Sequence, residues 1–319
     1  MSIVFDFEEQ VSALEKKIIE LRNAAQIGDI DVANEITRMQ NKIDRMLTQI
    51  YQKLTPWQTV QVSRHPDRPK FTYYLDNIFE DFIEIAGDRL FADDQAIITG
   101  FATIDNIKCC IIGQEKGIDT ESRLKHNFGM PKPEGYRKAI RIMDLANKFN
   151  LPILTFIDTA GAYPGLESEE RGVAEAIAKC MEKSFQLKVP FISTIIGEGG
   201  SGGAIAIATA DKVLMFEHSI YSVISPEGCA SILWKDETKN NLAAEVQKLT
   251  AKDLKALGVI DEIVKEPIGG AHRNKKLAAD TLKQVLIKNI QKELSLDSKS
   301  RQIRRRQKFK TIGDEFLIM

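Results

Sequence analysis

Long apolar runs and an excess of charge of one sign are both missing from this sequence of 319 residues. No segment approaches the ~18 consecutive apolar residues that a membrane-spanning helix needs, and residues 1–10 lack the charged-then-apolar pattern of a signal peptide. We therefore expect a cytoplasmic protein that binds no membrane. The 44 Lys and Arg residues nearly balance the 45 Asp and Glu residues, for a net charge of −1. Because binding to phosphates draws on an excess of basic residues, nucleic acid is not expected as the main partner.

Cysteine and histidine are also scarce, with four of each. No two cysteines form a C-x-x-C pair, and no histidine stands at a familiar ligand spacing from a cysteine, which argues against a structural zinc site. Isolated cysteines in a cytoplasmic protein behave as small apolar residues. We expect no metal on this chain and reduced, mostly buried thiols at Cys109, Cys110, Cys180 and Cys229.

The sequence does contain enough apolar material for a sizeable core, 43% of all residues against 28% charged. Two apolar stripes at helical spacing run over residues 11–25 and 36–50. Residues 28–31 interrupt the stripes and offer an Asp as a cap for the second helix. Residues 1–62 are therefore predicted to form a helical hairpin that packs either on its own body or on a partner subunit. Two prolines among the charges of residues 63–69 mark a boundary.

Residues 63–295 alternate between helical and strand patterns, which is typical of an α/β domain with parallel strands and crossover helices. A helix is predicted over 73–86, followed by a β-hairpin that pairs 97–104 with 107–113 and turns at Asp105 and Asn106. Further helices are predicted over 134–149, 170–187, 204–209 and 275–293, and strands over 151–157, 191–196, 213–216 and 221–224. The basic tail at 296–319 is expected to be solvated and frayed.

The segment from Gly197 to Ala204 has five glycines in its first seven residues and lies between a predicted strand and a predicted helix. It fits the G-x-G-x-x-G pattern of dinucleotide sites, and it also fits G-x-S-x-G, which would make Ser201 a hydrolase nucleophile with His218 or His272 as its base. A third interpretation takes the backbone N–H groups at the helix start as donors to an oxyanion. A tight turn without chemistry is the fourth.

Two more loops that contain glycine are predicted, at residues 127–138 and 157–165. Each lies at a junction between a predicted helix and a predicted strand. Ligands of open α/β sheets bind where such loops gather, so we expect the three loops to share one cleft.

These loops carry a resemblance to a known family. The segments 127–130, 157–159, 161–165, 197–204, 221–234 and 269–273 resemble the carboxyltransferase α subunits of bacterial-type acetyl-CoA carboxylases. The likeness extends over nearly the whole chain, with one departure at Ala160, where we expect the family to carry proline. The resemblance implies an α/β fold of the crotonase-like (ClpP/crotonase) type, a β-β-α superhelix, preceded by the N-terminal helical hairpin.

The same resemblance implies the chemistry and the partners. The carboxyl group would come from carboxybiotin, held on a separate biotin carboxyl carrier protein, and pass to acetyl-CoA to give malonyl-CoA for fatty acid synthesis. No side-chain base is required, because the deprotonated biotin removes the methyl proton. The partner would be a zinc-bearing carboxyltransferase β subunit in an α2β2 assembly. A scaffold subunit without catalytic groups remains the alternative.

The resemblance also assigns the site. It places the oxyanion donors on the amides of Gly202 and Gly203, and the lining of the biotin or thioester pocket on Gly129, Tyr163, Gly200, Ser201 and Pro226. His272 and Arg273 are expected in subunit contact or structural hydrogen bonds. Four basic residues are candidates for CoA phosphates, with a solvated surface as the alternative: Lys116, Lys125, Arg137 and Lys138.

Overall fold

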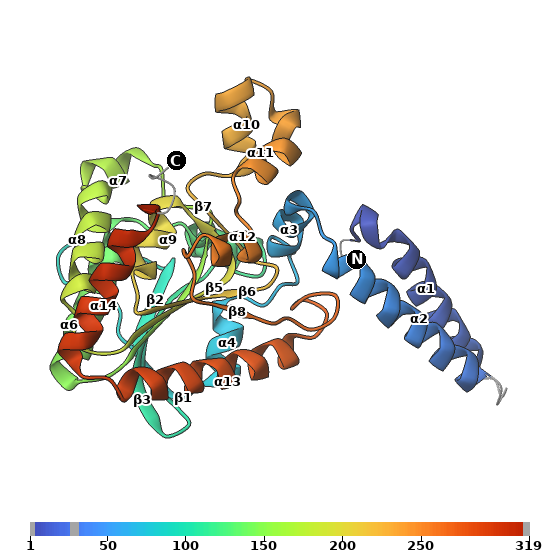
Figure 1. Ribbon diagram of the computed structural model, residues 1–319, viewed down its shortest axis with the longest axis horizontal. Helices are drawn as coiled ribbons and strands as arrows, with labels where there is room; N and C mark the ends of the chain where they lie inside the picture. The colour runs from blue at the N-terminus through green and yellow to red at the C-terminus, as the bar shows by residue number, and fades with distance from the viewer. Residues whose placement is uncertain (1–3, 26–31, 315–319) are drawn as a thin grey trace.

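The structure is a computed structural model that describes residues 4–25 and 32–314. Its centre is an eight-stranded sheet, in the order β1-β2-β3-β4-β5-β6-β8, with β7 paired to β5 beside this path (Figure 1). The strands are β1 (Glu80–Glu84), β2 (Ile97–Ile104), β3 (Ile107–Gln114), β4 (Ile153–Thr159), β5 (Phe191–Gly200), β6 (Lys212–Phe216), β7 (Ile220–Ser222) and β8 (Glu262–Val264).

The sheet begins antiparallel and continues parallel. Strands β2 and β3 form the predicted hairpin, in which Ile104 pairs with Ile107. Asp105 and Asn106 both have positive φ, at 48° and 62°, which is the backbone that a two-residue turn between twisted strands requires. From β3 onward β4, β5, β6 and β8 run parallel, as the alternation of helices and strands predicted.

One prediction at the sheet edge is wrong. The helix expected over 73–86 ends early: α4 (Phe71–Ile78) is followed directly by β1, which pairs antiparallel with β2. A register shift between Glu80 and Ile83, with Asp81 at φ 53°, lets β1 follow the twisted edge. Pairing with β2 therefore overrides the local helical pattern in the second half of this segment.

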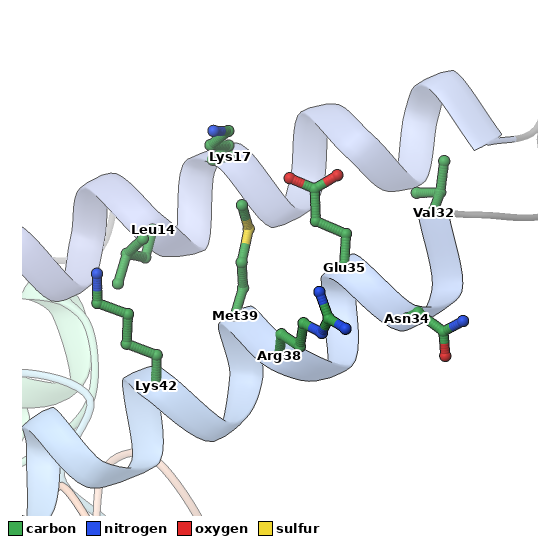
Figure 2. Close-up of a pocket in the computed structure, with 8 residues that line it drawn as sticks. All are labelled: Leu14, Lys17, Val32, Asn34, Glu35, Arg38, Met39 and Lys42. Atoms are coloured by element: carbon green, nitrogen blue, oxygen red, sulfur yellow. The ribbon is translucent and has the colours of Figure 1, made fainter.

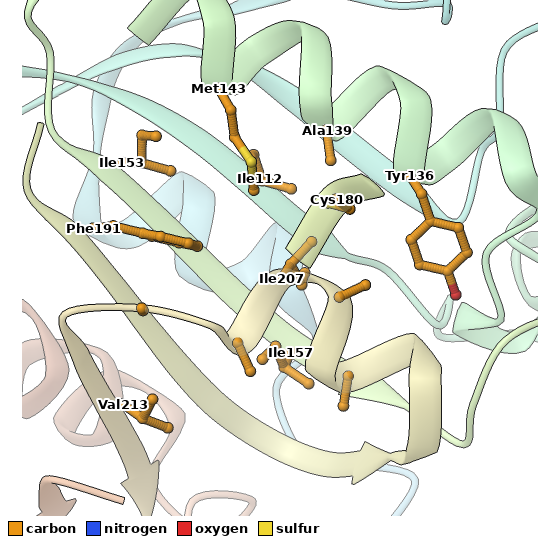
Figure 3. Packing of buried hydrophobic residues seen from close by; sticks show 14 of the residues in the cluster. Ile112, Tyr136, Ala139, Met143, Ile153, Ile157, Cys180, Phe191, Ile207 and Val213 are labelled. Atoms are coloured by element: carbon orange, nitrogen blue, oxygen red, sulfur yellow. The ribbon is translucent and has the colours of Figure 1, made fainter. Parts of the chain in front are cut away.

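Helices cover both faces of the sheet. On one face α6 (Pro133–Phe149), α8 (Val173–Gln186) and α9 (Ser201–Ala208) bury a large apolar cluster against the strands (Figure 3). On the other face α4 and α13 (Lys275–Leu294) form a second cluster. Every residue of β4 is buried as a result. All four cysteines are free and buried, as expected.

Helices α1 (Glu9–Ala25) and α2 (Val32–Gln52) form the predicted hairpin, which extends away from the sheet (Figure 1). The predicted break at residues 28–31, with its capping Asp, lies outside the described residues. Arg273 ties the hairpin to the body through Glu8 at 3.0 Å and Glu15 at 2.6 Å, so the hairpin contacts its own chain. A cavity of about 780 Å³ opens between the two helices, lined by side chains of both charges (Figure 2).

The remaining helices lie around the sheet and at its ends. A pair formed by α10 (Pro226–Trp234) and α11 (Asn240–Val246) projects from the body (Figure 1). Among the described residues, no helix is both long enough and apolar enough to span a bilayer. The others are α3 (Pro56–Ser63), α5 (Thr120–Lys125), α7 (Leu166–Glu170), α12 (Ala251–Ala256) and the short 3-10 helices η1 (Asp6–Glu8), η2 (Asn127–Gly129) and η3 (Glu237–Lys239).

The expectation of a frayed C-terminal tail is wrong for most of its length. Residues Ser298–Thr311 form a helix, α14, that packs beside α8. Arg305 is 1% exposed and binds Asp211 with two hydrogen bonds, at 2.6 and 2.9 Å. Arg301 donates to the carbonyl oxygens of Glu293 and Leu296. Because the arginines find buried acceptors, the basic segment is ordered rather than solvated.

Candidate functional site

The glycine-rich segment forms the turn between β5 and α9. A Cβ atom at Gly200 would lie 2.1 Å from the carbonyl oxygen of Ala160, and one at Gly203 would lie 2.6 Å from the carbonyl carbon of Gly161. A Cβ atom at either position would force the two backbone segments apart, so both positions strongly favour glycine. At Gly202 the nearest atom is the flexible end of Ile177, 3.1 Å away. The first turn of α9 therefore lies directly on the backbone of the loop after β4.

The start of α9 is an uncapped helix N-terminus. The first N–H groups of a helix have no partner within it, and the N-cap residue Gly200 supplies no side-chain hydrogen bond. The helix dipole adds a partial positive charge at this end. Ser201 is exposed and has φ 49°, so the backbone turns sharply where strand becomes helix. The amides of Gly202 and Gly203 thus lie where an oxyanion gains most from backbone donors.

Two polar side chains lock this turn to its neighbours. Gln114, at the end of β3, donates to the carbonyl oxygen of Gly203 at 2.7 Å and accepts from the N–H of Asp158 at 3.2 Å. Thr159 Oγ1 donates to the carbonyl oxygen of Gly161 at 2.8 Å and accepts from its N–H at 3.1 Å. The ends of β3 and β4, the loop after β4 and the first turn of α9 are therefore joined by hydrogen bonds.

The loop at 127–130 joins the same group. Asn127, Phe128 and Gly129 all have positive φ, at 49°, 54° and 77°. A Cβ at Gly129 would lie 2.8 Å from the carbonyl oxygen of Asp158, so this buried glycine allows the loop to lie against the end of β4. Tyr163, half-buried, donates its N–H to the carbonyl oxygen of Pro131 at 2.9 Å. The three loops expected to gather are in contact.

Pro226 lies further out, at the first position of α10, where it is buried. Its neighbour Glu227 accepts from Arg64 at 2.6 Å, and Arg64 also binds Glu198 at 2.7 Å. The residue is thus linked to the β5–α9 turn through Arg64 and the side chain of Glu198.

Beneath the loops lies a buried ionic network in which Lys116, predicted only as a candidate for CoA phosphates, pairs with two carboxylates. The ammonium of Lys116 lies 3.0 Å from Asp158 Oδ1 and 3.0 Å from Glu198 Oε2. Asp158 Oδ1 also accepts the N–H of Glu198 at 3.0 Å. Burial alone would lower the pKa of Lys116, but the two carboxylates outweigh burial and raise it. The same pairing holds the pKa of Asp158 below its usual value despite burial. All three groups are therefore charged at neutral pH.

Several predicted basic contacts take other roles. Lys138 is buried, and its ammonium binds Asp93 Oδ1 at 2.6 Å and the carbonyl oxygen of Asp94 at 2.7 Å, so it is not available to a CoA phosphate. Arg137 donates to the carbonyl oxygen of Arg171. Lys125 is exposed at the end of α5. Arg273 forms the structural ion pairs expected as one of its alternatives.

The histidines do not complete a hydrolase site at Ser201. His218 packs edge-on against Tyr51 with ring centroids 5.2 Å apart, and His272 stacks on His65 at 4.2 Å. Within the described chain, neither is hydrogen-bonded to Ser201. Burial, together with the charges of His65 and Arg68, lowers the pKa of His272 to about 3. The Ser201 hydroxyl therefore lacks the adjacent base that a serine nucleophile needs.

Comparison with solved structures identifies the fold. The chain is similar to transcarboxylase 12S, with a TM-score of 0.54 and 18% identity over 69% of this chain and 42% of that one. It is also similar to a chain of a Pseudomonas malonate decarboxylase hetero-tetramer, with a TM-score of 0.56 and 12% identity over 70% of this chain and 90% of that one. The crotonase-like α/β fold expected from the sequence is confirmed.

Sequence comparison gives a much closer likeness. The chain is 55% identical over 308 residues to the acetyl-coenzyme A carboxylase carboxyl transferase subunit alpha of Zymomonas mobilis, covering 97% of this chain and 98% of the relative. It is 53% identical over 312 residues to the protein of the same name from Rhodospirillum centenum, covering 98% of each. The family model for acetyl co-enzyme A carboxylase carboxyltransferase-like proteins matches residues 4–313. The chain therefore belongs to the acetyl-CoA carboxylase carboxyltransferase-like family.

Proposed function

We propose that this chain is the α subunit of an acetyl-CoA carboxylase carboxyltransferase, which moves a carboxyl group from carboxybiotin to acetyl-CoA and so forms malonyl-CoA for fatty acid synthesis. The observation that carries the proposal is the uncapped start of α9, held against the loop of Gly161 with no side chain between them. The family membership and the chain's nearly complete coverage of its relatives support it. The Ser201 hydrolase receives no such support.

The residues at the α9 turn fit a ureido group that gains negative charge on its oxygen. Gly200 to Gly203 bring only one side chain, that of Ser201, so the backbone can approach the ligand closely. The amides of Gly202 and Gly203 would donate to the oxygen, and the α9 dipole adds to their effect. When bound, carboxybiotin supplies the carboxyl group. Gln114 and Thr159 keep the amides aimed by holding the turn and the Gly161 loop in place.

The proposed pocket extends to the loops around the turn. Gly129, Tyr163 and Ser201 would line it beside the donors, and Pro226 would bound it where α10 begins. Amides fixed before the reaction need no reorganisation as charge develops, and one such donor contributes roughly 3 kcal/mol to transition-state stabilisation. This route needs no side-chain base, in agreement with the histidine positions.

The proposed partners supply the parts of the reaction that this chain does not carry. The carboxyltransferase would be completed by a zinc-bearing β subunit in an α2β2 assembly, and carboxybiotin would arrive on a biotin carboxyl carrier protein. Within this chain, the proposed parts are the hairpin of residues 1–62, the crotonase-like domain of 63–295 and the C-terminal segment of 296–319.

The reverse reaction tests the proposal. Malonyl-CoA and biocytin, a soluble biotin derivative, are mixed with this chain alone, with a β subunit alone and with both, and the release of acetyl-CoA is followed. We expect turnover only in the mixture. A folded complex that releases no acetyl-CoA would contradict the proposal, and a fluorophosphonate that labels Ser201 would favour the hydrolase.

A further inference from the structure

A second cavity, of about 400 Å³, lies beside the catalytic loops. Ala160 and Phe128 line it, and both belong to loops that contact the α9 turn or the end of β4. Its other notable feature is charge, because four cationic side chains line it together. They come from three separate parts of the chain and are Arg64, Lys70, Lys116 and Arg123.

Two of these cations are already matched. Arg64 binds Glu198 and Glu227, and Lys116 binds Asp158 and Glu198. The nearby buried Glu115 is also occupied, since its carboxylate accepts the N–H groups of Thr72 at 2.8 Å and of Gly117 at 2.7 Å. The carboxylates around the cavity therefore have their partners.

Lys70 and Arg123 are not matched. Lys70 is only 6% exposed, yet among the described residues its ammonium has neither a hydrogen bond nor a carboxylate at ion-pair distance. Burial lowers its pKa, and the more distant charge of Asp158 opposes that shift only in part. The guanidinium of Arg123, half-buried at the end of α5, likewise has no hydrogen bond or ion pair with the described residues. The Lys70 ammonium is therefore partly desolvated and has no acceptor in the described part of the chain, although its Nζ atom keeps some contact with solvent, and a cation in that setting costs free energy to keep charged.

A ligand that brings two negative charges would remove this cost. A phosphate group carries that charge and offers several acceptor oxygens, whereas a single carboxylate carries one negative charge. We propose that Lys70 and Arg123 form a phosphate-binding subsite for the CoA thioester, with Arg64 and Lys116 as its fixed walls. This inference rests on the proposed function and specifies how this chain would hold the acyl-CoA.

Steady-state kinetics of the complete complex test the assignment. In Lys70→Met and Arg123→Met, we expect KM for malonyl-CoA to rise about tenfold or more, because each variant loses a charge-assisted hydrogen bond, while kcat and KM for biocytin stay unchanged. Lys108→Met, which removes an exposed lysine of β3 outside the cavity, is the matched control. Repeating the assay with malonyl-3′-dephospho-CoA identifies the phosphate: the variants lose their effect if the 3′-phosphate is held and keep it if the diphosphate is held.

A binding measurement separates this inference from the proposed function. Calorimetry of the same complex with adenosine 3′,5′-bisphosphate and with inorganic pyrophosphate needs no turnover. At least one of the two should bind, at least tenfold more weakly to Lys70→Met than to wild type. If the complex is inactive but this difference persists, the function fails and the phosphate subsite stands. Binding that is equally tight in wild type and in Lys70→Met would overturn the subsite. Variants that raise KM for biocytin alone would overturn it as well. Lys70-dependent pyrophosphate binding without any effect on malonyl-CoA would overturn its assignment to CoA.

Discussion

Adjacent glycines at the start of α9 offer a matched pair of substitutions. Gly203→Ala places a methyl group 2.6 Å from the carbonyl carbon of Gly161, 2.7 Å from its oxygen and 2.9 Å from the nitrogen of Ala162. All three are backbone atoms. Gly202→Ala meets only the end of the Ile177 side chain, at 3.1 Å. Both variants keep the N–H groups, so they test where the amides point and leave the donors themselves in place.

The two variants are expected to differ in the size of their effect because the atoms around Gly203 are held more rigidly than those around Gly202. Gly161 is held by Thr159 and Gly203 by Gln114, so Gly203→Ala must displace the helix start or the loop by several tenths of an ångström. Overpacking of this kind costs roughly 1–3 kcal/mol of stability, and loss of one aimed donor lowers kcat by about 10²- to 10³-fold. In Gly202→Ala, Ile177 can move, and the gain in helix propensity of up to about 1 kcal/mol offsets the contact.

The assay is the reverse reaction in the complete complex, with urea unfolding of each variant measured in parallel. We expect Gly203→Ala to fold and to lose at least 100-fold in kcat, while Gly202→Ala stays within about threefold of wild type. Equal losses in the two variants, or wild-type kcat in Gly203→Ala, would refute the reasoning that the Gly161 loop aims the α9 amides.

Three further results are expected. Ser201→Ala should keep carboxyl transfer within about threefold of wild type, because the proposed donors are amides; a loss beyond 100-fold would restore the hydrolase interpretation. Arg305→Leu leaves Asp211 buried without its cation and should lower the free energy of unfolding in urea by about 3–5 kcal/mol, whereas a loss below about 1 kcal/mol would show that the pair contributes little. Because the pKa of His272 is about 3 when folded and near 6.5 when unfolded, the unfolded state binds the extra proton first, and stability should fall by about 2 kcal/mol between pH 7 and pH 5. His272→Phe should remove that part of the pH dependence, and an unchanged slope would contradict the assignment.

Local sequence patterns predicted those parts of the fold that are determined by interactions between residues close in sequence. The hairpin at 97–113 was predicted because Asp105 and Asn106 tolerate positive φ, and that property needs no distant partner. The glycine-rich turn at 197–204 was likewise predicted to be a strand-to-helix junction. By contrast, β1 exists because it pairs with β2 across the sheet edge, and its own residues read as helix.

The missed features depend on partners far away in sequence. Arg64 and Glu198 are separated by 134 positions, and Arg305 and Asp211 by 94. The spacing of charged residues along the sequence does not show which of them pair across such separations. For Asp158 the sequence did carry a signal: an acidic residue directly after a predicted buried strand, and in the structure inside the fully buried strand β4, must find a partner, but the sequence does not say which one.

The buried ion pair between Arg305 and Asp211 joins two segments of the chain that are translated at different times. Asp211 leads into β6 and accepts the N–H of Phe191 at the start of β5, so its carboxylate is held where these two neighbouring strands begin. Its cation, Arg305, is translated 94 residues later. Until then the strands that carry the glycine-rich turn enclose an unneutralised charge. The charge balance at the centre of the sheet therefore depends on helix α14, which is translated after all of the strands.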